Sequence, residues 1–265
     1  MPCKNGSISS SAPWLLRGTR VAAPCQRRVS ARAHRARHLH SYVLPNKRDP
    51  LGSNPTQAMP ILAVETVVAA IRACSVSPQR LVVAIDGRSG SGKSTVAEAV
   101  AQASGAVIVP CDDFFAASVS NAEWDRRTPE QRAADAIDWR RLKREAIEPL
   151  RTGRAARWYA FDFLAGPRGD GTYPLQRTPT ERASKPVVLL DGAYAARPEL
   201  ADVVDLSVLV EAAPSTREAR LAAREEADVL RQWHARWDLA EEHYFRHVRP
   251  PSGFDMVIQT DEVTA

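Results

Sequence analysis

The sequence predicts an α/β fold of three layers, with a parallel sheet between two layers of helices. Short apolar runs rich in Val, Ile and Leu alternate with segments of helix length, which is the pattern of β-α-β units. The runs are apolar throughout rather than at alternate positions, so both faces of each strand are expected to be buried. A glycine-rich segment follows the first run and precedes a helical pattern, as in α/β proteins that bind ligands at the carboxyl ends of their strands.

Five runs are predicted as strands, at 81–85, 106–109, 187–190, 206–210 and 256–258. The strand before the glycine-rich loop must lie centrally beside the third run, and right-handed crossovers then give the order 2-3-1-4-5. Helices are predicted at 93–103, 129–152, 197–203, 214–230 and 236–247. The region 153–186 is rich in Gly and Pro and is predicted as an irregular excursion.

The charge distribution divides the 265 residues into a basic extension, 1–58, and a domain, 59–265. The extension has a net charge of +9 and the domain a net charge of −4, so the overall charge of +5 does not indicate a nucleic-acid partner for the folded domain. The extension is predicted to be disordered. Three interpretations stay open: a mis-assigned start before Met59, a transit-like targeting segment, or a functional basic arm.

The remaining composition excludes several classes of protein. The four cysteines form no C-x-x-C pair, so neither a disulfide framework nor a zinc site is indicated. No apolar run approaches the roughly 20 residues that span a bilayer, because Glu65, Asp86 and Asp191 interrupt the best stretches. A soluble, cytoplasmic protein is expected, or an organellar one if the extension is a targeting segment.

The segment from Gly87 to Ser94 matches the P-loop pattern G-x-x-x-x-G-K-[ST] in the context that the pattern requires, after a buried strand and before a helix. Glycines let the backbone turn its N–H groups toward an anion at the helix N-terminus. The lysine can then reach the β- and γ-phosphates, and the serine hydroxyl can join a Mg²⁺ shell. The predicted ATP-binding residues are Gly87, Arg88, Ser89, Gly90, Ser91, Gly92, Lys93, Ser94 and Thr95.

Two carboxylates, Asp112 and Asp113, follow the second predicted strand. At this end of a parallel sheet an acid can face a nucleotide bound by the P-loop. One of the pair can accept the proton of a substrate hydroxyl during phosphoryl transfer. The alternative is a helix cap or a turn, which Asp also favours, and Asp113 fits that alternative better.

Two further features fit a phosphoryl-transfer site. Asp191 ends the third strand before a glycine, which is the form of a Walker B carboxylate that holds Mg²⁺ directly or through water. Arg217, Arg220 and Arg224 share one face of a predicted helix. They can fold over a triphosphate as a mobile lid, or they can form a solvated face paired with neighbouring glutamates.

With these motifs in order, residues 80 to 260 resemble the uridine kinase family, one of the P-loop kinases that include pantothenate kinase and phosphoribulokinase. The residues that carry the resemblance are Ile85–Thr95, Asp112–Phe115, Asp135–Asp138, Phe161–Phe163, Val188–Gly192, Arg217 and Arg220. The resemblance implies a three-layer α/β/α P-loop kinase with an Arg-bearing helical lid.

Carried over by position, the resemblance assigns a role to individual residues. It makes Asp112 the general base, Asp138 an acceptor for ribose hydroxyls, and Arg217 and Arg220 lid residues, which with Lys93 form the catalytic set. Phe161 and Asp162 are substrate-binding candidates together with Asp138. Ser94 and Asp191 are the predicted metal ligands.

The chain also departs from the family in ways that bear on the acceptor. Asp191 stands where the family more often has Glu, and Phe161 where it usually has Tyr. The usual histidine after the Asp-Phe pair is missing. The aromatic residues Trp124, Trp139, Trp158 and Tyr159 can stack on a planar base or belong to the core.

The predicted function is therefore an ATP- and Mg²⁺-dependent kinase of a small-molecule acceptor, most simply the 5′-hydroxyl of uridine or cytidine. The alternatives are a kinase of another small alcohol, of the pantothenate or sugar-phosphate type, and a regulatory ATPase without an acceptor. No membrane or nucleic-acid partner is expected for the domain, and homo-oligomerisation stays open.

Overall fold

A computed structural model of the chain describes residues 61–74, 80–224 and 227–261. The predicted extension 1–58 and its boundary with the domain lie outside the described residues. Within those ranges, no helix combines the length and the apolar character needed to cross a membrane.

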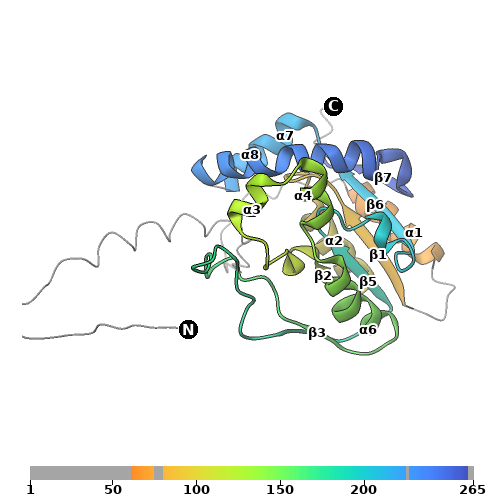
Figure 1. The fold of residues 1–265 in the computed structure, drawn as a ribbon. Coiled ribbons are helices and arrows are strands. Elements are labelled where there is room, and N and C mark those ends of the chain that lie inside the picture. Colours follow the sequence, from red (N-terminus) through yellow and green to blue (C-terminus); the bar gives the residue numbers. More distant parts are fainter. Residues whose placement is uncertain (1–60, 75–79, 225–226, 262–265) are drawn as a thin grey trace, which may run out of the picture. The chain divides into compact units, whose positions relative to one another are not determined.

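A five-stranded sheet forms the centre of the fold (Figure 1). Its order is β2-β5-β1-β6-β7, and every neighbouring pair is parallel. Counted along the chain these strands are 2-3-1-4-5, so the predicted topology is confirmed. The strands are β1 (Leu81–Asp86), β2 (Val107–Pro110), β5 (Val187–Asp191), β6 (Leu206–Glu211) and β7 (Met256–Gln259).

The helices of the described residues vary widely in length. The α-helices are α1 (Ile61–Cys74), α2 (Lys93–Ser104), α3 (Asn121–Arg126), α4 (Pro129–Asp135), α5 (Trp139–Leu142), α6 (Glu148–Arg151), α7 (Pro214–Arg224) and α8 (Ala227–His243). The π-helical turns are η3 (Lys143–Ile147) and η5 (Tyr244–Val248). The 3₁₀ turns are η2 (Cys111–Phe114), η4 (Pro198–Leu200) and η6 (Pro251–Gly253).

Alternation along the buried strands separates two hydrophobic clusters, one on each face of the sheet. Val83 and Ile85 of β1 pack with α1 and α2 on one face. Val82 and Ala84 belong to the cluster that contains residues of α3 to α6 and α8 on the other face. Period-2 side-chain geometry therefore gives the predicted three layers, α/β/α.

The predicted helix 129–152 is interrupted. Thr128 and Gln131 form a capping box that starts α4, but the helix ends before Ile137, which is buried and forms a bridge with Phe115. Asp138 then accepts a hydrogen bond from the Arg141 amide and starts α5. The prediction of one continuous helix was wrong because a local cap and a long-range bridge outweigh helix propensity here.

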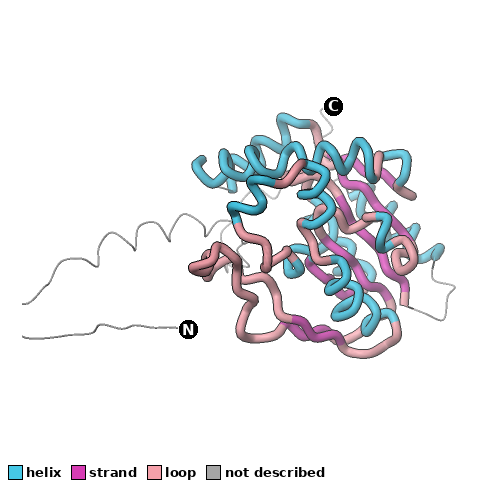
Figure 2. Tube along the Cα trace, in the orientation of Figure 1, coloured by secondary structure: helices cyan, strands magenta, loops and turns pink. Residues whose placement is uncertain are grey.

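Two other helix predictions change, and a hairpin was not predicted. The predicted helices 214–230 and 236–247 leave a gap at 231–235. Helix α8 runs through this gap without a break, because the segment holds neither Gly nor Pro. The predicted helix 197–203 is only the 3₁₀ turn η4. The excursion 153–186 contains an antiparallel hairpin, β3 (Ala156–Trp158) with β4 (Thr180–Arg182). The segment between these two strands is loop, as Figure 2 shows.

Candidate active site at the P-loop

The P-loop connects β1 to α2, as predicted. Gly90 and Gly92 have φ angles of 78° and 88°, a conformation that favours glycine. A Cβ atom at Gly90 would lie 2.7 Å from the carbonyl oxygen of Arg217, so α7 packs directly on the loop. Gly92 precedes the first residue of α2, Lys93. An anion held by the loop would therefore lie at the N-terminus of a helix.

A buried carboxylate that the sequence analysis did not assign lies beneath the loop. Asp86 accepts hydrogen bonds from the amides of Gly87 (2.8 Å), Tyr194 (2.9 Å) and Ala196 (2.9 Å) and from the Tyr244 hydroxyl (2.9 Å). Burial outweighs these bonds and raises the pKa of Asp86 to about 6. The only hint in the sequence is an acid at the end of an apolar strand. Its partners come from three separate segments, so Asp86 ties the loop to the segment after β5 and to η5.

The predicted lid arginines lie against the outer side of the P-loop. Arg217 Nη1 lies 3.4 Å from the carbonyl oxygen of Ser89. Arg220 donates to the carbonyl oxygens of Ser91 (3.2 Å) and Thr260 (2.7 Å). These contacts fix the Ser89 and Ser91 carbonyl oxygens, and fixed peptide groups can orient neighbouring amides of the loop toward an anion. The side chain of Arg224, the third arginine of the predicted stripe, lies outside the described residues.

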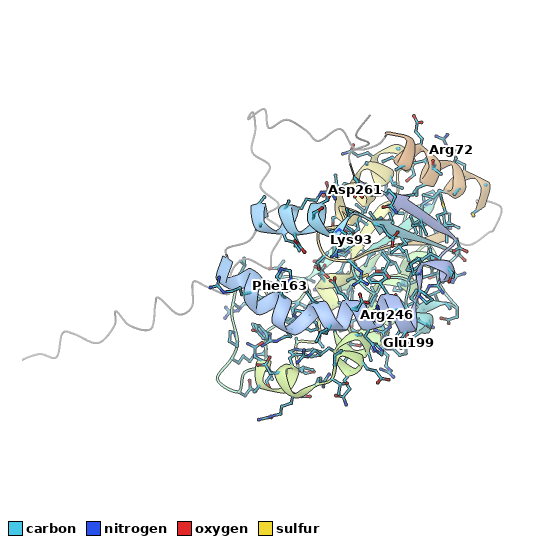
Figure 3. All side chains as sticks on the ribbon, turned by 90° about the horizontal axis from the view of Figure 1, so that it is seen from above. Arg72, Lys93, Phe163, Glu199, Arg246 and Asp261 are labelled. Atoms are coloured by element: carbon cyan, nitrogen blue, oxygen red, sulfur yellow. The ribbon has the colours of Figure 1, made fainter. Side chains whose placement is uncertain are left out.

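The end of β7 also meets the loop. Thr260 Oγ1 donates to the Ser91 carbonyl at 2.6 Å and would lie 3.5 Å from a Cβ atom at Gly92. Asp261 and Lys93, the residues that come directly after Thr260 and Gly92 in the sequence, are labelled in Figure 3. Residues about 170 positions apart in the chain thus form one wall of the site.

Asp191 ends β5 in register with Ile85 of β1, beside the P-loop. Its Oδ1 atom is buried and has no hydrogen-bond partner among the described residues. Burial raises the pKa of Asp191 to about 6, while Lys93 and a hydrogen bond from Ser94 oppose that rise. An unpaired carboxylate oxygen next to a serine hydroxyl fits a hard cation.

The donor set suits Mg²⁺ better than a metal held by protein alone. No group of three or more His, Cys, Asp or Glu side chains that can bind a metal occurs in the described part of the chain. Mg²⁺ commonly keeps several waters and takes only one or two carboxylates together with substrate phosphates. Ser94 and Asp191, predicted as metal ligands, are brought together as that arrangement requires.

The two acids after β2 differ in environment. Asp113 Oδ2 accepts a hydrogen bond from Trp158 Nε1 at 2.7 Å, and the Asp113 carbonyl accepts from Arg141 at 3.0 Å. Burial raises the pKa of Asp113. Asp112 is exposed. It follows β2 at the carboxyl end of the strand, where Pro110 is in register with Asp191, and its role as the general base stays a prediction.

The predicted substrate-binding residues lie near the turn that carries Asp112. The Asp138 amide donates to the Phe114 carbonyl at 2.8 Å, and the Phe161 amide donates to the Asp113 carbonyl at 2.8 Å. The side-chain oxygens of Asp138 and Asp162 accept local backbone hydrogen bonds. The fold therefore brings Asp138, Phe161 and Asp162 close to this turn. One oxygen of each carboxylate, however, already accepts hydrogen bonds from nearby backbone amides.

Aromatic residues form one side of this region. Phe161 is buried, and its ring centroid lies 5.2 Å from that of Phe115, 4.4 Å from that of Phe163 and 5.1 Å from that of Tyr173. Trp237 of α8 contacts Phe115 with centroids 5.4 Å apart. The sequence analysis did not assign Phe115, Tyr173 or Trp237.

The four aromatic residues considered for stacking divide between core and surface. Trp124 and Trp158 are each only 1 % exposed, so for these two the core alternative holds. Trp139 is partly buried against the same core. Tyr159 is 42 % exposed.

A cavity of about 370 Å³ lies beside the P-loop residues Arg88 and Ser91. Arg88 and Phe245 form part of its lining, with the guanidinium carbon 5.1 Å from the ring centroid. Ala213 and the first residue of α7, Pro214, also line it. A volume of this size next to an anion-binding loop can take a planar base.

Known proteins resemble this chain in fold more than in sequence. No protein-family model and no curated protein matches it. A solved structure of a possible uridine kinase from Bacillus stearothermophilus is 18% identical, with a TM-score of 0.55, over 75% of this chain and 98% of the other. A candidate fructose transport system kinase from Silicibacter sp. TM1040 is 22% identical, with a TM-score of 0.54, over 74% of this chain and 98% of the other. The predicted recognition is thereby confirmed at the level of fold: the chain shares the fold of these two structures.

Proposed function

We propose that the protein is an ATP- and Mg²⁺-dependent kinase that transfers the γ-phosphoryl group of ATP to a hydroxyl of a small metabolite. One observation carries the proposal most strongly. Asp191 is in register with Ile85 before the P-loop and with Pro110 before Asp112. The P-loop, Asp191 as the proposed metal ligand and the exposed Asp112 therefore follow the carboxyl ends of three neighbouring strands. Phosphoryl transfer needs a phosphate-binding loop, a metal ligand and a base arranged in this way.

In the proposed reaction the P-loop amides and Lys93 hold the β- and γ-phosphates, and the cavity beside Arg88 takes the base of ATP. Mg²⁺ held by Ser94 and Asp191 would neutralise charge on the phosphates. Asp112 accepts the proton of the acceptor hydroxyl as that oxygen bonds to the γ-phosphorus. The bond from the γ-phosphorus to the β–γ bridging oxygen breaks, and ADP leaves with the electron pair.

The favoured acceptor is the 5′-hydroxyl of a nucleoside such as uridine or cytidine. The aromatic group around Phe161 supports a planar substrate, because bases stack on aromatic rings. Asp138 is proposed to accept a hydrogen bond from a ribose hydroxyl, for which its second carboxylate oxygen is suited. That oxygen lies 4.0 Å from Arg141 Nε, beyond hydrogen-bond distance.

A sugar or another small alcohol is the second candidate. Phe161 has no phenolic donor, and both Asp138 and Asp162 already cap local backbone, which leaves few polar groups for a base. One of the two solved structures of similar fold described above is that of a candidate fructose transport system kinase. The proposal also includes a cytoplasmic location, and it leaves homo-oligomerisation open.

A screen of acceptors tests the proposal. ADP release from ATP with Mg²⁺ is measured with uridine, cytidine, pantothenate, and a panel of sugars and sugar phosphates. Stimulation by a nucleoside is expected, and stimulation by a sugar alone would select the second candidate. Slow ATP hydrolysis that no alcohol accelerates would contradict the kinase and favour a regulatory ATPase.

A further inference from the structure

The C-terminal half of α8 brings a buried acid against the anion-binding loop. Glu241 is only 3 % exposed, and its carboxylate accepts hydrogen bonds from both donors of Ser89. The Ser89 hydroxyl lies 2.5 Å from Oε1, and the Ser89 amide lies 3.2 Å from Oε1 and 3.1 Å from Oε2. No feature of the P-loop pattern requires this contact, which joins residues 152 positions apart.

A carboxylate is an unfavourable neighbour for a triphosphate, because like charges repel more strongly where water is scarce. Burying the charge is also costly unless hydrogen bonds compensate for it. The two donors of Ser89 supply that compensation. They also fix the direction of the Ser89 amide, which is thereby turned to Glu241.

Ser89 is held on its other side as well. Arg217 lies 3.4 Å from the Ser89 carbonyl oxygen, so this residue is held through its amide, hydroxyl and carbonyl. The next peptide groups of the loop lead directly to Gly92 and the first turn of α2. Fixing Ser89 therefore limits the conformations of the loop before any anion binds, and such preorganisation strengthens binding.

We infer that Glu241 is a positioning residue for the P-loop. Its side chain is long enough for the carboxylate to accept the hydrogen bonds of Ser89. By fixing Ser89 it preorganises the amides that follow for the phosphates of ATP. This inference rests on the proposed function, since it assumes that the loop binds ATP. It assigns no contact between Glu241 and the nucleotide.

The same face of α8 also reaches the acceptor region. Trp237, four residues before Glu241, contacts Phe115, and Tyr244, three residues after it at the start of the adjoining turn η5, donates to Asp86. Residues at this spacing share one side of a helix. Helix α8 and η5 together thus reach from the aromatic group to Asp86 beneath the P-loop. Glu241 lies between these two contacts and can therefore accept hydrogen bonds from Ser89.

Two substitutions separate the reach of the side chain from its charge. Glu241→Asp keeps the charge but withdraws the carboxylate by one methylene, whereas Glu241→Gln keeps an oxygen acceptor at the original distance without the charge. Asp238→Asn serves as the matched control, since Asp238 lies on the same helix, is exposed, and pairs with His234.

Affinities for ATP with Mg²⁺ and for adenosine are measured by calorimetry on each full-length variant, together with its melting temperature. Glu241→Asp is expected to weaken ATP about tenfold, as loss of a hydrogen bond to a charged group implies, with no change for adenosine. Glu241→Gln should stay within about threefold of the wild type, and Asp238→Asn should match it.

Three results would overturn the inference. The first is an Asp variant that binds ATP as the wild type does, and the second is one whose affinities for ATP and adenosine fall together. The third is a Gln variant that binds ATP worse than the Asp variant, since charge and not reach would then decide. A wild-type protein that bound ATP no more tightly than adenosine would overturn the proposed function as well, so the two failures are distinguishable.

Discussion

Tyr244 donates its phenolic hydrogen to the buried carboxylate of Asp86 across a distance of 2.9 Å. The two residues are 158 positions apart, one at the end of the central strand and the other in the π-helical turn that follows α8. Asp86 also receives the first amide of the P-loop. This contact therefore ties η5 to the strand end beneath the P-loop.

Replacement of Tyr244 by Phe removes one of the four donors to Asp86. We expect the free energy of unfolding to fall by about 1–3 kcal/mol, because a buried charged group loses a hydrogen bond. Denaturant unfolding at pH 7 provides the measurement. Tyr159→Phe is the matched control at an exposed tyrosine, with an expected change within about 0.5 kcal/mol. Equal effects of the two changes would show that the contact contributes nothing.

Lys93→Ala and Asp112→Asn should separate nucleotide binding from chemistry. Loss of Lys93 removes the charge that we propose holds the phosphates, so ATP binding should weaken and phosphoryl transfer should stop. Asp112→Asn should leave ATP binding nearly unchanged and lower turnover by at least about 10²-fold, as for a lost general base. Nucleotide titration and turnover are measured for both variants.

Asp113→Asn provides the control for Asp112→Asn. An asparagine oxygen can still accept the hydrogen bond from Trp158 Nε1, so turnover of this variant should stay near that of the wild type. If Asp112→Asn were active and Asp113→Asn inactive, the assignment of the base would be reversed.

Asp191 should make stability depend on pH. Its pKa rises from 3.8 to about 6 on folding, so the folded state binds more protons than the unfolded chain between these values. Stability from this group is full below pH 4 and is lost as the pH rises through 6, by on the order of 3 kcal/mol.

Asp191→Asn should remove that part of the pH dependence. Without nucleotide or metal, the variant is expected to gain stability relative to the wild type at pH 7 but not at pH 4. Unfolding curves at both pH values test this. A difference in stability between the two proteins that is the same at both pH values would contradict the raised pKa.

Arg217→Ala and Arg220→Ala test the predicted lid. If closure of this helix supplies charge to the transition state, kcat should fall more than the KM for ATP rises, since only contacts that strengthen in the transition state accelerate chemistry. Arg220 also holds the Ser91 and Thr260 carbonyls, so its variant should lose more thermal stability than the Arg217 variant. Lower stability with unchanged specific activity would show that the arginines are structural only.

Local patterns in the sequence were enough to predict the sheet and the loop. Each strand is a continuous apolar run, and burial on both faces of a parallel sheet leaves few alternatives for such runs. Gly90 and Gly92 indicated the P-loop because the backbone there needs angles that favour glycine. The positions of Asp112 and Asp191 could be predicted for a different reason, because acids that follow neighbouring parallel strands emerge at the same carboxyl end of the sheet.

The sequence alone did not indicate which residues hold the loop in place, and only the tertiary structure decided this. Asp86, Glu241 and Thr260 contact the P-loop region from positions up to 169 residues away. Their sequence neighbourhoods resemble any strand end or amphipathic helix. A local pattern records how a segment folds, but the partner of a buried polar group is set by which segments the topology brings together, and burial then makes that partner obligatory.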